Sequence, residues 1–442
     1  MTNALCYATH SSACGFKPMR FSRHAPGDND VCIAVKYCGV CHSDVHAAKN
    51  DFMRTVYPFV PGHEIAGTVT SVGKAVRNFK VGDNVGVGCF VDSCLDCRQC
   101  KRGDEQFCLK GMTGTYGSFP NHGRAGTEIT KGGYSNMMVV HEHFVVKVPS
   151  SVPLEKAGPL LCAGITTYAP LVKHKVGQGS RVGVNGLGGL GTMAVKQAKA
   201  MGAEVTVISR SSRKADYAKQ IGADHFVISA DPASVQAQAA SLDLVIDTVS
   251  SRHDIQPSLF AGSSSLLGLL DANGVWVYCG LILDMQDVQP MRLVVKQNAV
   301  TGTLIGGMAL LQECLDFCGK HRVLPETKTV PVWEVNQVFE LLDAGNDSGL
   351  RYVLDIESTL NEACFDRPAE KPPRLHSGKS RTLASLAFIA SRAMLAKVEG
   401  AVLDRPLMAL AVGAATCAFA VAGVMATANG ARTVTSQAFA GY

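Results

Sequence analysis

The sequence predicts an α/β protein in which a β-rich, loop-rich domain accompanies a doubly wound parallel sheet. Three observations support this fold class. The 442 residues exceed what one hydrophobic core usually supports, so at least two domains are expected. Short β-branched runs cut by Gly, Pro and Asp fill residues 30–150. After Pro149, strand and helix patterns alternate instead.

The alternating part begins with SRVGVN, a glycine turn, the helical stretch TMAVKQAKAMG and the strand EVTVIS, which together form a βαβ unit. The alternation continues to GVWVYCG and indicates an open parallel sheet with helices on both faces. We place this domain at residues 151–296. Residues 1–150 and 297–356 then form the β-rich domain, because the chain returns to it near its end.

The C-terminal part has a different composition. A Pro- and Lys/Arg-containing stretch predicts a linker over 357–384, and a helical tail follows over 385–442. Residues 407–427 carry no charge and are long enough to span a bilayer. Their apolarity comes largely from Ala and Gly, so a buried hairpin or a docked helix stays open beside a membrane helix.

Charge and cysteine content exclude some function classes. The formal net charge is +5, and the last 87 residues supply nine Lys/Arg against six Asp/Glu. The remaining body is nearly balanced and lacks basic blocks, so we assign no nucleic-acid partner. The N-terminal residues show no signal architecture, which favours a cytoplasmic chain with reduced thiols. Closely spaced cysteines among the 16 then indicate metal ligands or catalytic groups.

The strongest motif is a run of four cysteines in CLDCRQCKRGDEQFC: Cys94, Cys97, Cys100 and Cys108. Four thiolates on one irregular loop form a tetrahedral zinc site, and no helix or strand periodicity explains this spacing. A site closed by four sulfur atoms has no position for substrate. We therefore expect a structural zinc ion that stabilises the loop.

A second group of metal-ligand types is dispersed along the chain: Cys41, His63, Glu64 and Cys162. Two cysteines and one histidine are a known catalytic zinc set that leaves one position open. Spacing alone does not separate this interpretation from packed core residues.

The run Gly186-Leu187-Gly188-Gly189-Leu190-Gly191 lies between a predicted strand and a predicted helix, as a dinucleotide-binding turn requires. The next strand ends in Ser209-Arg210-Ser211-Ser212-Arg213-Lys214, without the acid that would bind the ribose hydroxyls of NAD. Hydroxyls and cations suit a ribose 2′-phosphate and favour NADP, although a solvated basic loop is the alternative.

Taken in order, the motifs YCGVCHSDVH, PGHEIAGTV, VGVGCFVDSCLDCRQC, LLCAGITTY, GLGGLG and TGTLIGGM resemble the cinnamyl alcohol dehydrogenase branch of the zinc-containing medium-chain dehydrogenases. The resemblance covers residues 1 to about 356. It implies a GroES-like catalytic domain, a Rossmann domain, a homodimer, two zinc ions per chain and NADP(H). It further implies reversible hydride transfer between NADP(H) and a primary alcohol or aldehyde, with aldehyde reduction as the favoured direction.

Residue by residue, the resemblance makes Cys41, His63 and Cys162 the catalytic zinc ligands and Glu64 an alternate ligand. The resemblance also implies that Ser43 passes a proton toward His46. Asp44 could orient a zinc ligand. The implied cofactor contacts are Ser43, Thr166, Gly186, Leu187, Gly188, Gly189, Leu190, Gly191, Ser209, Arg210, Ser211, Ser212, Arg213, Lys214, Thr248, Gly280, Thr303, Leu304 and Ile305.

Two features depart from that family. Tyr116 stands in a pocket loop where reductases of bulky cinnamyl aldehydes tend to have tryptophan, so broad-range microbial aldehyde reductases are the closer analogy. The C-terminal 87 residues have no counterpart. Two alternatives stay open: a zinc-independent, quinone-type reductase of the same superfamily, and a non-catalytic scaffold tethered to a membrane by the tail.

Overall fold

A computed structural model describes residues 2–367 and 372–373, apart from residues 14, 257–264, 283–287, 289 and 346–348. The predicted tail over 385–442, with its candidate membrane segment 407–427, lies outside the described residues. Within the described part of the chain, no helix has the length and apolarity needed to cross a bilayer.

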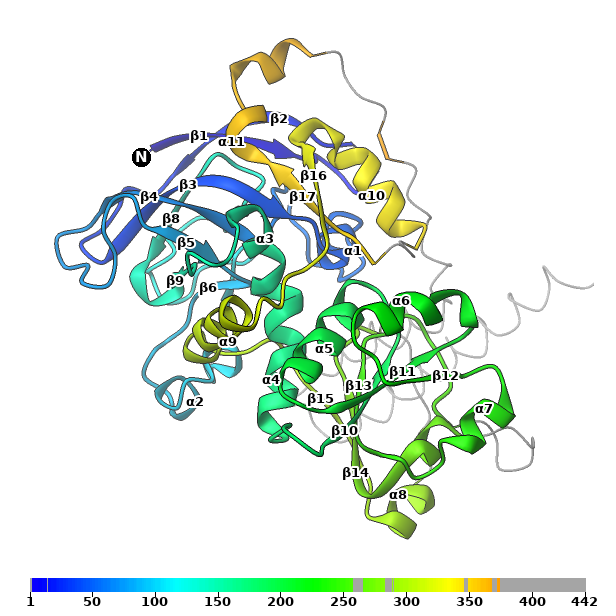
Figure 1. The fold of residues 1–442 in the computed structure, drawn as a ribbon. Coiled ribbons are helices and arrows are strands. Elements are labelled where there is room, and N and C mark those ends of the chain that lie inside the picture. The colour runs from blue at the N-terminus through cyan, green and yellow to red at the C-terminus, as the bar shows by residue number, and fades with distance from the viewer. Residues whose placement is uncertain are drawn as a thin grey trace, which may run out of the picture. The chain divides into compact units, whose positions relative to one another are not determined.

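The first sheet combines strands from both ends of the described chain. Its strand order is β16-β17-β3-β4-β5-β9, and β8 also pairs with β3. Strand β17 runs antiparallel to β3, with Val353 opposite Gly39. Figure 1 shows this return as yellow and orange segments beside blue strands. The bounds are β3 Asp30–Gly39, β4 Ile65–Val72, β5 Asn84–Val87, β8 Met137–His141, β9 Val146–Lys147, β16 Thr327–Pro331 and β17 Arg351–Asp355.

Two hairpins and several helices accompany this sheet. Two hairpins pair β1 with β2 and β6 with β7. Their bounds are β1 Thr2–Ala8, β2 Lys17–Arg23, β6 Phe90–Asp92 and β7 Thr113–Gly114. The helices are α1 His42–Ala48, α2 Arg98–Lys101, α3 Leu154–Pro159, α9 Met308–His321, α10 Val335–Asp343 and α11 Ile356–Thr359.

The second sheet is parallel throughout, as the alternating pattern predicts, with strand order β12-β11-β10-β13-β14-β15. The valines and isoleucines of its central strands are buried, which is typical of a sheet covered on both faces. The strands are β10 Arg181–Asn185, β11 Glu204–Ser209, β12 His225–Ile228, β13 Leu242–Asp247, β14 Leu270–Tyr278 and β15 Ala299–Gly302. The helices are α4 Ile165–Lys173, α5 Gly189–Ala200, α6 Ala215–Gln220, α7 Pro232–Ala237 and α8 Pro290–Lys296.

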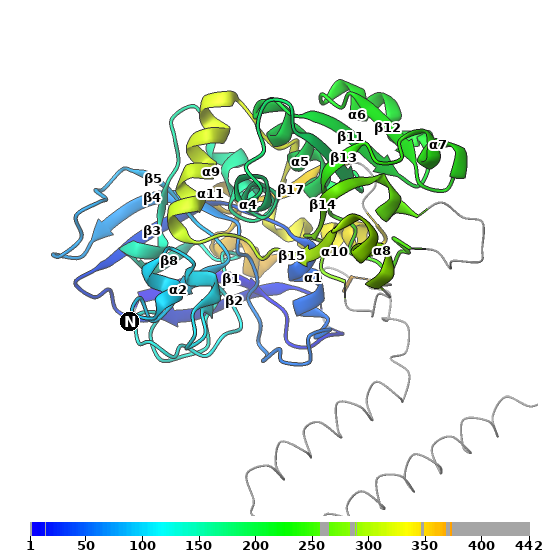
Figure 2. The same ribbon diagram turned by 90° about the horizontal axis from the view of Figure 1, so that it is seen from below.

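The strand order has a functional consequence. The chain leaves β10 toward β11 on one side and later fills the other side with β13, so the order reverses between these two strands. Ligands of doubly wound sheets bind at this reversal, outside the carboxyl ends of the strands. Figure 2 shows α9 beside α4, where elements of the first sheet's part of the chain meet those of the second.

Two predicted boundaries differ from the structure. Strand β15 pairs with β14 up to Gly302, so the parallel sheet extends past residue 296, where we expected that domain to end. The predicted linker over 357–384 also begins with ordered structure, because Leu360 and Cys364 are buried. The Arg367 guanidinium then lies 3.7 Å from the centroid of the Trp333 ring. The remaining domain limits stay predictions.

Candidate active site

The four clustered cysteines come together on the loop around α2. Their sulfur atoms all lie within 4.8 Å of one another. Cys94 Sγ is 3.8 Å and Cys97 Sγ 3.5 Å from Cys100 Sγ. Sulfur atoms at about 2.3 Å from a zinc ion are about 3.8 Å apart in a tetrahedron, so the cluster has the dimensions of a zinc site.

Backbone N–H groups of the same loop donate to these sulfur atoms. The N–H of Cys97 lies 3.3 Å from Cys94 Sγ, and the N–H of Leu109 lies 3.4 Å from Cys97 Sγ. Hydrogen bonds from the Cys100 and Leu109 backbone lower the pKa of Cys97 to about 6. These hydrogen bonds therefore favour the thiolate form of Cys97, which is the form that binds zinc, whereas burial raises the pKa of Cys100 to about 12.

The dispersed cluster also converges. Cys41 precedes α1, His63 precedes β4, and Cys162 lies in a wide π-helical turn, Leu160–Gly164, between α3 and α4. Cys162 Sγ is 3.9 Å from Cys41 Sγ and 3.2 Å from His63 Nε2. Zinc bound by two sulfurs and one nitrogen requires separations of about 3.5–3.8 Å, so the residues fit one metal ion.

Asp44 holds two of these ligands in place. Its fully buried carboxylate accepts hydrogen bonds from the Cys41 and Gly62 backbone N–H groups and from the Tyr134 hydroxyl. It also accepts from His63 Nδ1 at 3.1 Å. Because Nδ1 carries the proton, Nε2 keeps its lone pair and faces the two sulfur atoms.

Glu64 lies behind the cluster and forms a buried ion pair with Arg351 from β17. Burial raises the pKa of Glu64 to about 7, although the Arg351 charge opposes this shift. One carboxylate oxygen of Glu64 belongs to the group of ligand atoms within 4.8 Å, and its Oε2 has no hydrogen-bond partner among the described residues. The arrangement places a carboxylate beside the metal position and a guanidinium behind it.

A polar path leads from the cluster along α1. Ser43 Oγ is 3.6 Å from Cys41 Sγ, and His46 follows one turn later. His46 Nδ1 contacts Asp51 Oδ2 at 2.7 Å. The Asp51 side chain is half-buried, and Ser43 and His46 both line the same pocket.

The glycine-rich turn connects β10 to α5 at the strand-order reversal. Gly186 has φ +85°, and a Cβ atom on Gly191 would lie 2.1 Å from the Gly186 carbonyl oxygen. A Cβ on Gly188 would meet nothing within 4 Å, so space is free beside the backbone. The Thr248 hydroxyl, after β13, donates to the carbonyls of Asn185 and Gly186 and fixes the turn. A pyrophosphate fits here at the helix N-terminus.

The six-residue segment Ser209–Lys214, which begins at the last residue of β11, lies at half-buried and exposed positions. Lys214 Nζ donates to the Leu187 carbonyl at 2.9 Å, which connects this segment to the glycine turn. Arg210 and Arg213 are exposed. They place positive charge beside the end of β11.

A pocket of about 400 Å³ connects the dispersed cluster with the parallel sheet. It brings together Cys41, His63 and Cys162 with His46 of the proton path. Seven of the predicted cofactor contacts also line it: Ser43, Thr166, Leu190, Gly280, Thr303, Leu304 and Ile305. Tyr116 also lines it, with its ring centroid 5.5 Å from that of His63. The pocket therefore holds the reacting groups and an aromatic wall.

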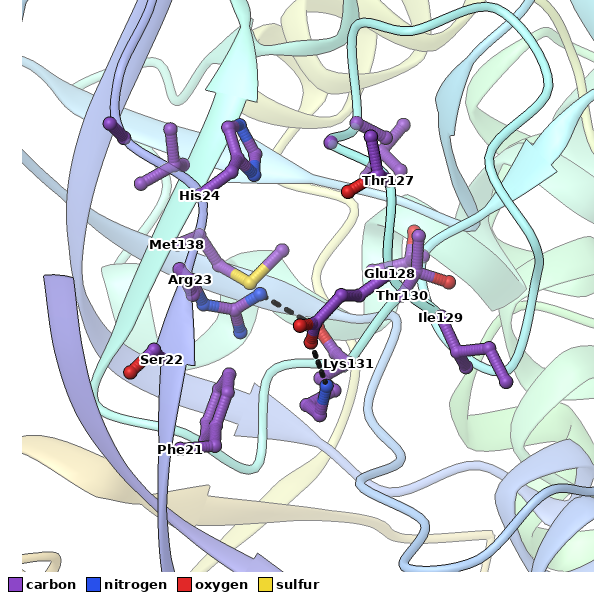
Figure 3. Close-up of a pocket in the computed structure, with 16 residues that line it drawn as sticks. Phe21, Ser22, Arg23, His24, Thr127, Glu128, Ile129, Thr130, Lys131 and Met138 are labelled. Carbon is purple, nitrogen blue, oxygen red and sulfur yellow. Dashed lines mark hydrogen bonds and ion pairs between the residues drawn. The ribbon is translucent and has the colours of Figure 1, made fainter. Parts of the chain in front are cut away.

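A separate cavity of about 310 Å³ lies beside β2 and the 125–131 segment (Figure 3). Its Arg23 donates from every guanidinium nitrogen to the protein, including the carbonyls of Lys131, Gly132 and Met137. Arg23 thus fixes the backbone, and we assign this cavity no catalytic role.

Three residues of the site are missing from the sequence-based prediction. Arg351 is more than 280 residues from its partner Glu64, and only the return of β17 brings them together. Asp51 gave a weak local signal, five residues after His46. Cys89 lines the pocket from VGVGCFVDSC, where the four-cysteine run obscured it.

Comparison with known proteins is consistent with this geometry. The Alcohol dehydrogenase GroES-like domain family matches residues 27–150, and the Zinc-binding dehydrogenase family matches 189–320. A mannitol dehydrogenase from Petroselinum crispum is 46% identical, covering 78% of this chain and 98% of its own. An NADP-dependent alcohol dehydrogenase C from Mycolicibacterium smegmatis is 43% identical, covering 81% and 99%.

Two solved structures are similar over the same region. A cinnamyl alcohol dehydrogenase from Sorghum bicolor has a TM-score of 0.76 and 42% identity, covering 82% of this chain and 100% of its own. The Helicobacter pylori enzyme complexed with NADP(H) has a TM-score of 0.73 and 40% identity, covering 81% and 99%. The predicted GroES-like and Rossmann folds are confirmed.

Proposed function

We propose that this chain, which belongs to the zinc-binding medium-chain alcohol dehydrogenases, reduces aldehydes with NADPH and catalyses the reverse oxidation of primary alcohols. The observation that carries the proposal is the convergence of Cys41, His63 and Cys162 in a pocket that continues toward the glycine turn. Neither alternative, a zinc-independent reductase or a scaffold, accounts for this convergence together with the path from Ser43 to His46.

When bound, zinc polarises the substrate oxygen and NADPH supplies the hydride. Cys41, His63 and Cys162 hold the metal, Glu64 is the alternate ligand, and Asp44 keeps His63 Nε2 directed at it. Ser43, close to Cys41, exchanges a proton with the substrate oxygen.

The proton then moves toward His46, whose Nδ1 is held by Asp51. The Tyr116 and Phe59 rings, 5.2 Å apart, restrict water near the reacting carbon.

The coenzyme preference depends on the segment after β11. Arg210, Arg213 and the neighbouring serines are suited to the 2′-phosphate of NADP, because they supply positive charge and hydrogen-bond donors. Gly186 to Gly191 bind the pyrophosphate, and Thr166, Gly280 and Thr303 to Ile305 line the nicotinamide end of the pocket. The four clustered cysteines hold the second, structural zinc.

Initial rates of NADPH and NADH oxidation with aliphatic and aromatic aldehydes test this function. We expect NADPH to be preferred, and Arg210→Ala combined with Arg213→Ala to raise KM for NADPH with little effect on KM for NADH. NADPH binding without turnover of any aldehyde contradicts the proposal and favours the scaffold.

We also propose a homodimer formed through the free edge of the parallel sheet. Among the described residues, strand β15 has a neighbouring strand on one side only, and α8 beside it exposes Met291, Val294 and Val295 by 70–74%. Pairing of β15 with a second copy would cover both features. Light scattering of the purified chain should give twice the monomer mass, and Val295→Glu should shift it toward the monomer.

The location of the chain rests on sequence alone. We propose a cytoplasmic enzyme whose segment 407–427, uncharged and 21 residues long, forms a membrane anchor. Sedimentation with membranes at high salt and release by detergent support the anchor. Full recovery in the supernatant without detergent contradicts it.

A further inference from the structure

The active-site pocket has one side chain with a permanent charge, Arg54. Among the described residues that line it, there is no Asp, Glu or Lys. Arg54 is exposed, and no described carboxylate forms an ion pair with it. The pocket therefore presents an uncompensated cation in addition to the groups that the reaction uses.

Arg54 is held at the pocket by the loop after α1. The Thr55 hydroxyl donates to the Ala47 carbonyl at 2.7 Å, and the Thr55 N–H donates to Asn50 Oδ1 at 2.9 Å. The Tyr57 hydroxyl donates to the Ala48 carbonyl at 2.7 Å. Because these bonds attach the loop to the helix that carries Ser43 and His46, they hold the backbone at Arg54 close to the reacting groups.

An aromatic ring separates Arg54 from the proton path. The Phe52 ring centroid is 5.9 Å from that of His46, and Arg54 Cζ is 5.9 Å from the Phe52 centroid. Figure 1 shows α1, which begins this series, between the two sheets. From the proton path outward, the His46 imidazole is followed by the apolar Phe52 ring and then by the Arg54 guanidinium.

We propose that Arg54 selects aldehydes that carry an anionic group, a carboxylate, at the end remote from the carbonyl. The proposal rests on the proposed aldehyde reductase function and names its substrate class. An apolar body of the substrate packs on Phe52 while its carboxylate accepts hydrogen bonds from the guanidinium. The absence of acidic side chains from the pocket lining leaves nothing there to repel the anion.

Matched aldehyde pairs test the proposal: benzaldehyde with 4-formylbenzoate, and hexanal with 6-oxohexanoate. The quantity measured is the ratio of kcat/KM for the anionic aldehyde to that for its neutral partner. We expect Arg54→Met to lower this ratio about tenfold and Arg54→Lys to retain most of it. In the native enzyme, 0.5 M NaCl should also lower the ratio because it screens an exposed charge.

The outcomes separate the two claims. Turnover of the neutral aldehydes with a ratio that Arg54→Met leaves unchanged in both pairs overturns the role of Arg54 and keeps the reductase function. No turnover of any of the four aldehydes overturns the reductase function, and the role of Arg54 with it.

Discussion

The two candidate zinc sites are built in opposite ways. The four clustered cysteines lie within one loop of 15 residues. Backbone N–H groups of this loop donate hydrogen bonds to the sulfur atoms. Cys41 and Cys162 are 121 residues apart, and the groups that orient their cluster are side chains, chiefly Asp44 and Arg351. The loop site is local in sequence, whereas the dispersed site exists only in the folded chain.

The difference matches the two roles. Four sulfur atoms complete a tetrahedron, so a metal in the loop has no position for substrate. The dispersed cluster provides two sulfurs and one nitrogen and faces a pocket of about 400 Å³. Stability should therefore depend on the first site and activity on the second, and the following variants test this separation in order of expected effect.

The largest effect is expected from Cys162→Ser. Loss of the catalytic metal should lower kcat/KM on the order of a thousandfold or more, because the metal supplies several kcal/mol of stabilisation to the transition state. Elemental analysis should show one zinc ion per chain instead of two. Cys32→Ser, in β3 and remote from both clusters, is the control and should keep both ions. Native-like turnover of Cys162→Ser favours the zinc-independent reductase.

A smaller effect on activity is expected from Asp44→Asn. The amide keeps the shape but weakens the bond that fixes the His63 ring, so zinc affinity and kcat/KM should fall about 10–100-fold. Competition with a chelator followed by assay measures both. Equal zinc affinity in the two proteins shows that Asp44 does not orient the ligand.

In the loop site, Cys100→Ser should mainly affect stability. Loss of the structural zinc should lower Tm by roughly 5–10 °C, while kcat at low temperature stays within a few-fold of native. Thermal unfolding and zinc content are the measurements. A loss of activity as large as that of Cys162→Ser, with the fold intact, contradicts the separation of roles.

On the proton path, Asp51→Asn should lower kcat about tenfold and change its pH profile, with KM little affected. His46 loses the carboxylate that holds its ring, but the metal site is untouched. A profile identical to that of the native enzyme removes Asp51 from the path.

The smallest effect concerns a histidine remote from both zinc sites. His253 faces acceptors with both ring nitrogens, the Ser251 carbonyl at 2.9 Å and the buried Asp247 carboxylate at 2.7 Å. Burial lowers the pKa of His253, but the Asp247 carboxylate outweighs it, and the net shift is upward. This contribution is fully present below the unfolded pKa of about 6.5 and is lost as pH rises through the higher folded value.

Urea unfolding of the native protein and His253→Gln at pH 6 and pH 9 measures this contribution. The free energy of unfolding should differ by about 1 kcal/mol at pH 6 and by less at pH 9. If the difference in the free energy of unfolding between the two proteins grows with pH, the charged form of His253 does not stabilise the fold.

The sequence was sufficient for features whose signals are local. The spacing of Cys94, Cys97, Cys100 and Cys108 predicted their cluster, and the turn from Gly186 to Gly191 was predicted between a strand and a helix, where it lies. Residue types alone left the dispersed cluster open beside packed core residues, because no periodicity connects Cys41 with Cys162, and a family resemblance then assigned it.

Arg351 and the pocket position of Arg54 could not be predicted from the sequence. Arg351 reaches Glu64 only because β17 pairs with β3, and a strand-end arginine gives no local signal. The extent of β15 was missed for a similar reason, since four residues carry too little pattern to assign them to a sheet. Strand pairing between distant segments decides the positions of Arg351 and β15.

The most direct test of the central claim is aldehyde-dependent NADPH oxidation by the full chain, with zinc counted before and after graded chelation. The account predicts that activity disappears as the first zinc ion per chain is removed, while the fold remains, and that added zinc restores it. Activity that persists after both ions are gone would contradict the assignment of Cys41, His63 and Cys162 to a catalytic metal.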